Sequence, residues 1–313
     1  MKDQIIQNRV NLYKKIELNC DLGRNHGIYF DVKPTEDVLQ KLTNSAIGYI
    51  AKTLNCFYKE DFIIDEDFLQ KYERKILDLP NRTPNGAFHP KRENVREYNQ
   101  LQRNVVEALK SIGILNNCKA LQPCTVRILS GKSSELDHTR PLATTKLHSD
   151  AWASHVGDAI LGIPLLGDPT TALEFYEPQE VSSDFFSPLK NYDDGLKKFK
   201  DKKFLGYARM GYISVFDHSC LHRTSLKGGG IRVSIDFGII VDNPESLYYD
   251  CTKREKVNLE DYRYQYFDLD VYSKLGKEVF IFVEETLKQA HMKYSSKETK
   301  TYERATIKIV NKI

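Results

Sequence analysis

The chain has 313 residues, of which 41% are hydrophobic and 28% are charged, a composition typical of a folded globular protein and not of a disordered or fibrous one. Its net charge of +3 is too small for an electrostatic footprint on DNA or RNA, so we expect no nucleic-acid partner. No stretch is apolar for long enough to span a membrane, and residues 1–15 lack the apolar centre of a signal peptide.

The cysteines indicate the compartment. They form no Cys-x-x-Cys pair, and their spacing matches neither a zinc site nor a disulfide framework. Together with the missing export signal, this predicts reduced thiols and a cytoplasmic protein without a membrane partner. The six are Cys20, Cys56, Cys118, Cys124, Cys220 and Cys251.

Residues 1–120 are predicted to form a helical layer. Apolar residues recur at helical spacing from Val38 to Ile50, and a second, stronger stripe runs from Val95 to Ile112. Gly113 follows that stripe as the residue expected to end the helix. Segment 79–86 is rich in Pro, Asn and Gly and is predicted to be a loop between the two helices.

From residue 121 to about 242 the pattern changes to short β-rich runs separated by Gly, Pro and Asp. Runs of this kind favour a sandwich or jelly roll. The polar segment 177–203 interrupts them and is predicted to be a partly helical insertion. The runs span residues 122–129, 144–148, 158–166, 171–176, 204–208, 211–217, 220–226 and 231–241.

Residues 243–313 are predicted to be helical again, because apolar side chains recur at helical spacing between Val271 and Leu287. Helices with one apolar face need another layer to bury it. We therefore predict one domain of mainly β class, with a jelly-roll core (121–242) buttressed by helices from both ends.

The residues with the clearest chemistry are His148, Asp150 and His222. Two imidazoles and one carboxylate can hold one face of an octahedral Fe(II) and leave three positions open, two for a bidentate 2-oxo acid and one for O2. With 8 His and 43 acidic residues, about one His-x-Asp/Glu match is expected by chance, so the tripeptide alone favours an ordinary strand histidine. His218 competes as third ligand; we prefer His222 because residues 215–217 resemble the incoming strand.

A second motif follows on the next predicted strand. Residues 231–239 alternate strictly between apolar and small or polar, which puts Arg232 and Ser234 on one face. A guanidinium fork and a hydroxyl suit the distal carboxylate of 2-oxoglutarate. The alternative is an ordinary half-exposed strand, and segment 223–225 is a second Arg-x-Ser match to which we assign nothing. The position of Arg232, beyond a glycine-rich turn after His222, favours the functional interpretation.

Set among β-rich runs, these motifs resemble the Fe(II)/2-oxoglutarate-dependent oxygenases, most closely the phytanoyl-CoA dioxygenase-like branch. The likeness covers roughly residues 121–241. It is most specific around the second histidine, in residues 210–217, 221–224 and 231–237, and segment 161–176 resembles the central strand pair of that branch. The helical flanks carry no such signature.

The resemblance implies a double-stranded β-helix in which His148, Asp150 and His222 hold Fe(II), while Arg232, helped by Ser234, anchors 2-oxoglutarate. It also implies that 2-oxoglutarate and O2 become succinate and CO2 as an unactivated C–H bond of a substrate is oxidised. Related halogenases have a small residue in place of the metal carboxylate. The presence of Asp150 therefore favours hydroxylation, desaturation or ring formation.

Three further residues are weaker candidates for contact with substrate or co-substrate. Arg127 has apolar neighbours and needs a partner, either a substrate anion or a buried carboxylate. Lys146 shares the strand face of His148 and could meet a carboxylate, or lie on the rim. Trp152 could form a wall of the pocket or lie in the core.

We therefore expect an Fe(II)/2-oxoglutarate-dependent hydroxylase acting on a small molecule, with the insertion 177–203 and the loop 130–143 as lids. Two alternatives remain. One is a cupin-like metalloenzyme that does not use 2-oxoglutarate, and the other is a non-catalytic ligand-binding jelly roll. The substrate and the oligomeric state are left open by the sequence.

Overall fold

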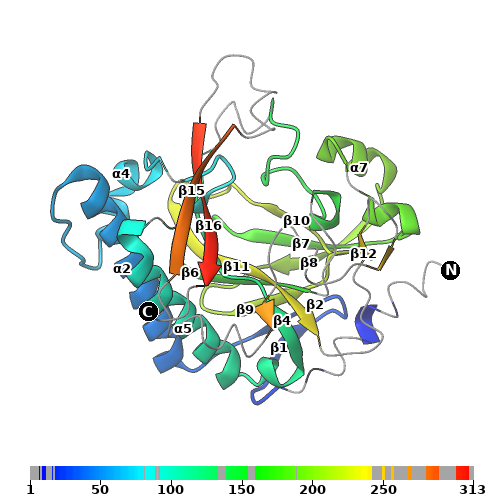
Figure 1. The fold of residues 1–313 in the computed structure, drawn as a ribbon. Helices are drawn as coiled ribbons and strands as arrows, with labels where there is room; N and C mark the ends of the chain where they lie inside the picture. Colours follow the sequence, from blue (N-terminus) through cyan, green and yellow to red (C-terminus); the bar gives the residue numbers. More distant parts are fainter. Residues whose placement is uncertain are drawn as a thin grey trace.

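Two antiparallel sheets and a layer of helices form the body of the fold (Figure 1). None of the helices in the described part of the chain is both long and apolar enough to cross a membrane. The computed structural model describes residues 7, 9–11, 16, 18–80, 82–88, 90, 92–132, 139–153, 159–187 and 189–241, and the strands at 249–250, 255–256, 267–268, 280–288 and 301–309.

The larger sheet runs in the order β1-β2-β9-β6-β11-β4-β14, and β5 pairs with both β11 and β3. Strand β11 is its centre, because it pairs with β6 along one edge and with β5 and β4 along the other. The strands are β1 (Leu22–Asn25), β2 (Tyr29–Val32), β3 (Ala87–Phe88), β4 (Cys118–Leu121), β5 (Thr125–Ser130), β6 (Ala159–Gly167), β9 (Ile213–Phe216), β11 (Ile231–Val241) and β14 (Phe267–Asp268).

The smaller sheet has the order β10-β7-β8, and its strands are β7 (Leu173–Pro178), β8 (Lys202–Tyr207) and β10 (Leu221–Thr224). Buried aromatic and aliphatic side chains fill the space between the two sheets, among them Tyr29, Ile160, Phe175 and Phe216. This arrangement confirms the mainly β, jelly-roll class predicted from the sequence, and the predicted runs coincide with β5 to β11 except at 144–148, where only His148 forms an isolated bridge.

Helices α2 (Glu36–Tyr58) and α5 (Val95–Ser111) cover the outer face of the larger sheet (Figure 1). Both were predicted. Their apolar stripes and the sheet form one buried cluster that includes Leu42, Leu101 and Ile163. Gly113 follows the end of α5 with a φ of 84°, a backbone conformation that favours glycine. Short turns complete this layer: α3 (Phe68–Lys71), α4 (Glu73–Leu77), η1 (Arg92–Asn94) and η2 (Ile114–Asn117).

Strand β11 separates the helix layer from the interior of the jelly roll. Its odd positions, including Val233 and Phe237, are buried in the cluster shared with the helices. Its even positions Arg232 and Ser234 are also buried, but on the opposite face, toward the smaller sheet. The expected alternation is therefore present, with the polar residues facing inward rather than toward water.

The N-terminal region differs from the expectation of a purely helical layer. Strands β1 and β2 precede α2, and β2 pairs with β9 inside the larger sheet. All four residues of β2 are buried. A four-residue strand buried on both faces shows no alternation, which is why periodicity did not reveal it.

The prediction of C-terminal helices is wrong for the described residues of 243–313, which form strands. These are β12 (Tyr249–Asp250), β13 (Glu255–Lys256), β14, β15 (Phe280–Lys288) and β16 (Thr301–Ile309). The run Phe280–Val283 consists of aromatic and β-branched residues, which favour a strand. Because a short apolar run fits the helical period as well as the strand period, the pattern was read as a helix. The start of the predicted stripe, 271–279, lies outside the described residues.

The insertion 177–203 is partly helical, as predicted, with η4 (Ser183–Phe186) and α7 (Tyr192–Lys198). Figure 1 shows α7 on the opposite side of the molecule from α2 and α5. Part of the expected lid loop 130–143 lies outside the described residues. The five cysteines in the described part of the chain are not paired in disulfides.

Candidate metal centre and adjoining cavity

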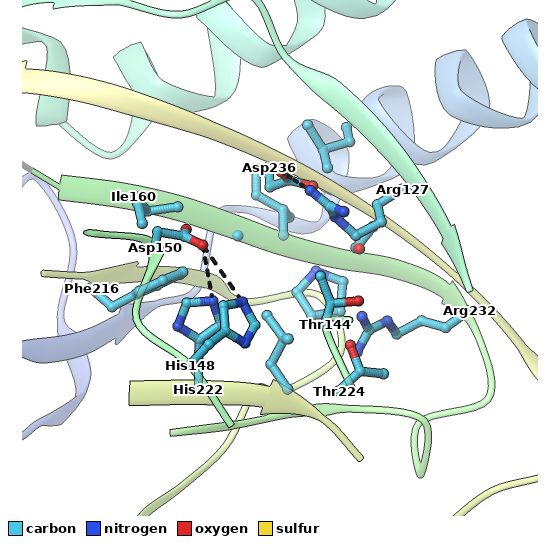
Figure 2. A pocket seen from close by; sticks show the side chains of 16 residues that line it. Arg127, Thr144, His148, Asp150, Ile160, Phe216, His222, Thr224, Arg232 and Asp236 are labelled. Carbon is cyan, nitrogen blue, oxygen red and sulfur yellow. Dashed lines mark hydrogen bonds and ion pairs between the residues drawn. The ribbon is translucent and has the colours of Figure 1, made fainter. Parts of the chain in front are cut away.

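His148, Asp150 and His222 come together at one end of the smaller sheet. Each offers one ligand atom, and these atoms lie within 4.8 Å of one another. Oδ1 of Asp150 is 3.7 Å from Nε2 of His148 and 3.6 Å from Nε2 of His222, as the dashed lines in Figure 2 indicate. Ligands about 2.1 Å from a metal ion at right angles lie about 3 Å apart, so a small contraction would let one ion contact all three.

The backbone fixes the two histidines opposite each other. The amide of His148 donates to the carbonyl of His222 at 2.9 Å, and the amide of His222 donates to the carbonyl of His148 at 2.8 Å. This exchange of hydrogen bonds adds one antiparallel pair at the edge of β10 that does not face β7. The sequence separates the two residues widely, but the ladder brings their side chains to the same face.

The same two rings have a defined tautomer. Nδ1 of His148 is 2.7 Å from the carbonyl oxygen of Lys146, and Nδ1 of His222 is 3.2 Å from that of Cys220. A carbonyl oxygen only accepts, so Nδ1 carries the proton in each ring and the lone pair of Nε2 is available. Partners of this kind orient metal-binding histidines in known sites.

The protonation states suit a cation ligand set. Burial and the neighbouring ring of His222 lower the pKa of His148 to about 3, so this imidazole is neutral at neutral pH. Burial opposes ionisation of Asp150, but the basic side chains around it, with His222 the largest contributor, outweigh burial and keep the pKa of Asp150 below its usual value. The site therefore offers the neutral imidazole of His148 and a carboxylate.

Ser149 fixes the turn that carries Asp150. Its hydroxyl oxygen accepts a hydrogen bond from the amide of Ala151 at 3.1 Å and caps the single turn η3 (Asp150–Trp152). The same hydroxyl donates to the carbonyl of His218 at 2.5 Å. Ser149 thereby joins the turn bearing one ligand to the loop that leads into the strand bearing another.

A cavity of about 550 Å³, including space open to solvent, adjoins this group between the two sheets (Figure 2). Its polar wall carries charges of both signs, and its apolar wall is formed by Ile160, Leu173 and Phe216. The full lining is Arg127, Thr144, His148, Asp150, Ile160, Gly162, Ile163, Pro164, Leu173, Phe216, His222, Thr224, Arg232, Ser234, Ile235 and Asp236.

Arg232 is the unusual member of this wall. Its side chain is almost fully buried, at 1% exposure, and Nη1 donates to the carbonyl of Thr171 at 2.7 Å. Nε and Nη2 have no hydrogen-bond partner among the described residues. Burial lowers the pKa of Arg232 to about 10, which still leaves it charged at neutral pH. A buried cation with two unsatisfied nitrogens is costly unless an anion completes it.

Arg127 lines the same cavity but already has a partner. Its Nε and Nη2 each donate to the Asp236 carboxylate at 2.8 Å, and Nη1 donates to the carbonyl of Asn85 at 2.7 Å. Of the two partners considered from the sequence, a protein carboxylate is the one present. Asp236 lies on the same face of β11 as Arg232, so alternation could have indicated it.

Lys146 and Trp152 do not line the cavity. Nζ of Lys146 is 2.5 Å from Oδ2 of Asp193, an ion pair to α7. Trp152 is fully buried in an aromatic cluster, where Nε1 donates to the carbonyl of Phe185 at 2.9 Å. Of the two alternatives for Trp152, the structure places it in the core. His218 is buried but is not one of the three residues that form the metal-binding group.

Sequence reasoning missed two threonines on the cavity wall, Thr144 and Thr224. Thr224 is buried, its Oγ1 has no hydrogen-bond partner among the described residues, and Figure 2 shows it beside Arg232. The signal was available, because Thr224 is two residues after His222 on β10 and therefore shares its face. The amide of Thr224 donates to the carbonyl of Thr144 at 2.9 Å, a contact without a sequence signal.

No family model and no curated protein matches this chain. Among solved structures it is similar to the non-heme alpha ketoglutarate dependent carbocyclase SnoK from nogalamycin biosynthesis, at 10% identity and a TM-score of 0.42, over 77% of this chain and 86% of that one. The non-heme alpha ketoglutarate dependent epimerase SnoN matches at 10% identity and a TM-score of 0.35, over 76% of this chain and 83% of that one. HygX from Streptomyces hygroscopicus, with nickel and 2-oxoglutarate bound, matches at 10% identity and a TM-score of 0.32, over 67% of this chain and 82% of that one.

These matches do not single out the phytanoyl-CoA dioxygenase-like branch. Identity and TM-scores this low do not transfer an activity, so the function has to be inferred from the residues of the site.

Proposed function

We propose that this protein is an Fe(II)/2-oxoglutarate-dependent oxygenase. The observation that carries the proposal is the pairing of two features in one cavity: a His-Asp-His group and a buried guanidinium with unsatisfied nitrogens. The first feature alone would also fit a metalloenzyme without a co-substrate, and the second alone would fit any anion-binding pocket. Together they supply a metal face and a counter-charge for a dianion that binds between them.

The donor set fits ferrous iron. Two imidazole nitrogens and one carboxylate on a single face are typical of non-haem Fe(II) oxygenases, whereas structural zinc sites have four protein ligands. His148, Asp150 and His222 would hold the ion. When bound, Fe(II) supplies the redox chemistry by which O2 and 2-oxoglutarate oxidise a C–H bond.

Arg232 would bind the distal carboxylate of 2-oxoglutarate through Nε and Nη2, the two nitrogens that lack partners among the described residues. The Thr224 hydroxyl, which likewise lacks a described partner and lies beside Arg232, would donate a further hydrogen bond, and Ser234 lines the same cavity. Electrostatics supports this orientation, because the site offers a metal cation at one end and a guanidinium at the other.

The reaction we propose is hydroxylation of a small molecule. One oxygen atom of O2 enters succinate, the other enters the new hydroxyl group, and CO2 is released from 2-oxoglutarate. The protein groups hold the reactants in place and keep charges matched, and the apolar wall of Ile160, Leu173 and Phe216 limits the access of water.

The experiment is succinate formation by anaerobically iron-loaded protein that is then given O2 and 2-oxoglutarate. We expect turnover by the wild type and its loss in Arg232→Ala. Arg223→Gln is the matched control, since Arg223 belongs to the second Arg-x-Ser segment, does not line the cavity and pairs with Glu174. Succinate formation retained in Arg232→Ala would contradict the role of Arg232 as the anchor of 2-oxoglutarate. An iron-bound wild type that forms no succinate would favour a cupin-like enzyme that does not use 2-oxoglutarate, or a non-catalytic binding protein.

A further inference from the structure

We propose that the insertion 177–203 is not a lid but a support for the metal centre, with Tyr192 as the positioning residue that fixes the ring plane of His148. The inference rests on the proposed function only in its use of His148 as a metal ligand. It assigns a role to a segment that lies outside the cavity and far from the ligands in sequence.

The central contact is a stacked pair of rings. The ring centroids of Tyr192 and His148 are 4.3 Å apart, and their planes differ by 13°. Tyr192 is buried, at 3% exposure, and it does not line the cavity, so it meets His148 from outside the space available to ligands. Stacking fixes the ring plane, while the hydrogen bond from Nδ1 to Lys146 fixes the direction of the ring in that plane.

The insertion is anchored where it meets the ligands. The amide of Tyr192 donates to the carbonyl of Pro141 at 3.0 Å, and the amide of Leu189 donates to the carbonyl of Trp152 at 2.7 Å. Gly195 packs so closely on Trp152 that a Cβ there would lie 2.5 Å from the indole ring. Since Trp152 ends the turn that begins with Asp150, α7 is packed against the supports of two ligands at once.

An ion pair makes a second link to the same ligand. Nζ of Lys146 is 2.5 Å from Oδ2 of Asp193, the residue after Tyr192, and the carbonyl of Lys146 is the acceptor for His148. Adjacent residues of α7 therefore contact the His148 ring directly and the residue that orients it. A lid would show exposed apolar residues over the cavity mouth, whereas Tyr192, Phe185 and Phe199 are buried with Trp152 in one cluster.

The test is the Kd for Co(II), measured by calorimetric titration without 2-oxoglutarate, together with the Tm of the metal-free protein. Tyr192→Leu removes the stacked ring, and we expect its Kd to rise about tenfold. Tyr192→Phe keeps the ring and should stay within about twofold of the wild type. Phe185→Leu is the control, because it removes a ring from the same cluster that contacts Trp152 and Phe199, at interplanar angles of 56° and 63°, and not His148. It should lower the Tm and leave the Kd unchanged.

If Tyr192→Leu does not fold, the Asp193→Asn variant tests the proposal instead, because it removes the ion pair to Lys146. We expect its Kd for Co(II) to rise about two- to fivefold. Unchanged Kd values in these variants, or an equal loss of affinity in Phe185→Leu, would overturn the role of Tyr192 while the proposed function stands. A wild type that binds no Co(II) would overturn the proposed metal site itself. The two failures are therefore distinguishable.

Discussion

Arg232 combines a structural cost with a functional use. A charged group this deeply buried is normally paired, yet only one of its side-chain nitrogens has a hydrogen-bond partner among the described residues. Proteins retain such groups where a ligand completes them. The guanidinium of Arg127, in the same cavity, shows the contrast, since Asp236 satisfies it within the protein.

The first prediction concerns Arg232→Met. Removal of an uncompensated buried charge should raise the free energy of unfolding of the ligand-free protein by about 1 kcal/mol, as measured by urea denaturation. The same substitution should weaken 2-oxoglutarate binding about 30-fold or more, measured by titration of the Ni(II)-loaded protein. A destabilised variant with unchanged 2-oxoglutarate affinity would contradict the role assigned to Arg232.

Ser149 gives a second prediction at this scale. Ser149→Ala removes both the cap of η3 and the hydrogen bond to the carbonyl of His218, which is left buried. We expect the free energy of unfolding to fall by about 1–3 kcal/mol. Ser149→Thr keeps the hydroxyl and serves as the control. Equal stability of the alanine variant and the wild type would show that the turn does not depend on this cap.

At the scale of elements, the strands separate stability from chemistry. Outer positions of β6 and β11 such as Leu161 and Val233 pack in the cluster shared with the helices, and inner positions such as Ile160 and Arg232 line the cavity. Ile163 and Ile235 belong to that cluster and also reach the cavity. Substitutions on the two faces should therefore have different consequences, although the residues are neighbours in the chain.

Leu161→Ala tests this separation. Leu161 is fully buried on the helix side of β6 and does not line the cavity. We expect a loss of about 2–5 kcal/mol in the free energy of unfolding, with an unchanged Kd for metal and 2-oxoglutarate. Ile160→Ala, on the cavity side, is the counterpart and should alter ligand affinity. A change of metal affinity in Leu161→Ala would mean that the two faces are coupled.

How far the sequence predicts these elements depends on the length of the pattern. The alternation in β11 and the stripe of α5 extend over many residues, and both were predicted with nearly correct bounds. Strand β2 is too short for either pattern, and the apolar run in β15 fits both. The described residues of the C-terminal segment were therefore assigned to the wrong class.

The same limit applies to the site. The sequence identified the three metal-binding candidates and Arg232, and alternation could have added Thr224 and Asp236. Tyr192 could not be predicted from the sequence, because its contact with His148 depends on how the insertion 177–203 folds back onto the metal-binding residues. Contacts between distant segments follow from packing, and local patterns do not encode them.

At the scale of the whole molecule, a buried carboxylate ties the N-terminal strands to the jelly roll. Asp31 of β2 is fully buried and accepts hydrogen bonds from Arg24, Arg209 and Tyr29. Burial opposes ionisation, but the hydrogen bonds from Arg209 and Arg24 outweigh it and hold the pKa of Asp31 below its usual value. The network joins β1 and β2 to the turn before β9.

This network predicts a dependence of stability on pH. A carboxylate with a lowered pKa in the folded state contributes stability above its unfolded pKa, about 3.9, and that contribution is lost as the pH falls through the folded pKa. Asp31→Asn should cost about 3–5 kcal/mol near pH 7 and should flatten the decrease of Tm below about pH 4. Identical pH profiles for the variant and the wild type would contradict this.

The most direct test of the whole account is a crystal structure of the protein grown anaerobically with Fe(II) and 2-oxoglutarate. We predict one metal ion bound by His148, Asp150 and His222, and a carboxylate of 2-oxoglutarate within hydrogen-bond distance of Nε and Nη2 of Arg232. A metal ion bound elsewhere, or 2-oxoglutarate at the metal with Arg232 still unpaired, would contradict it.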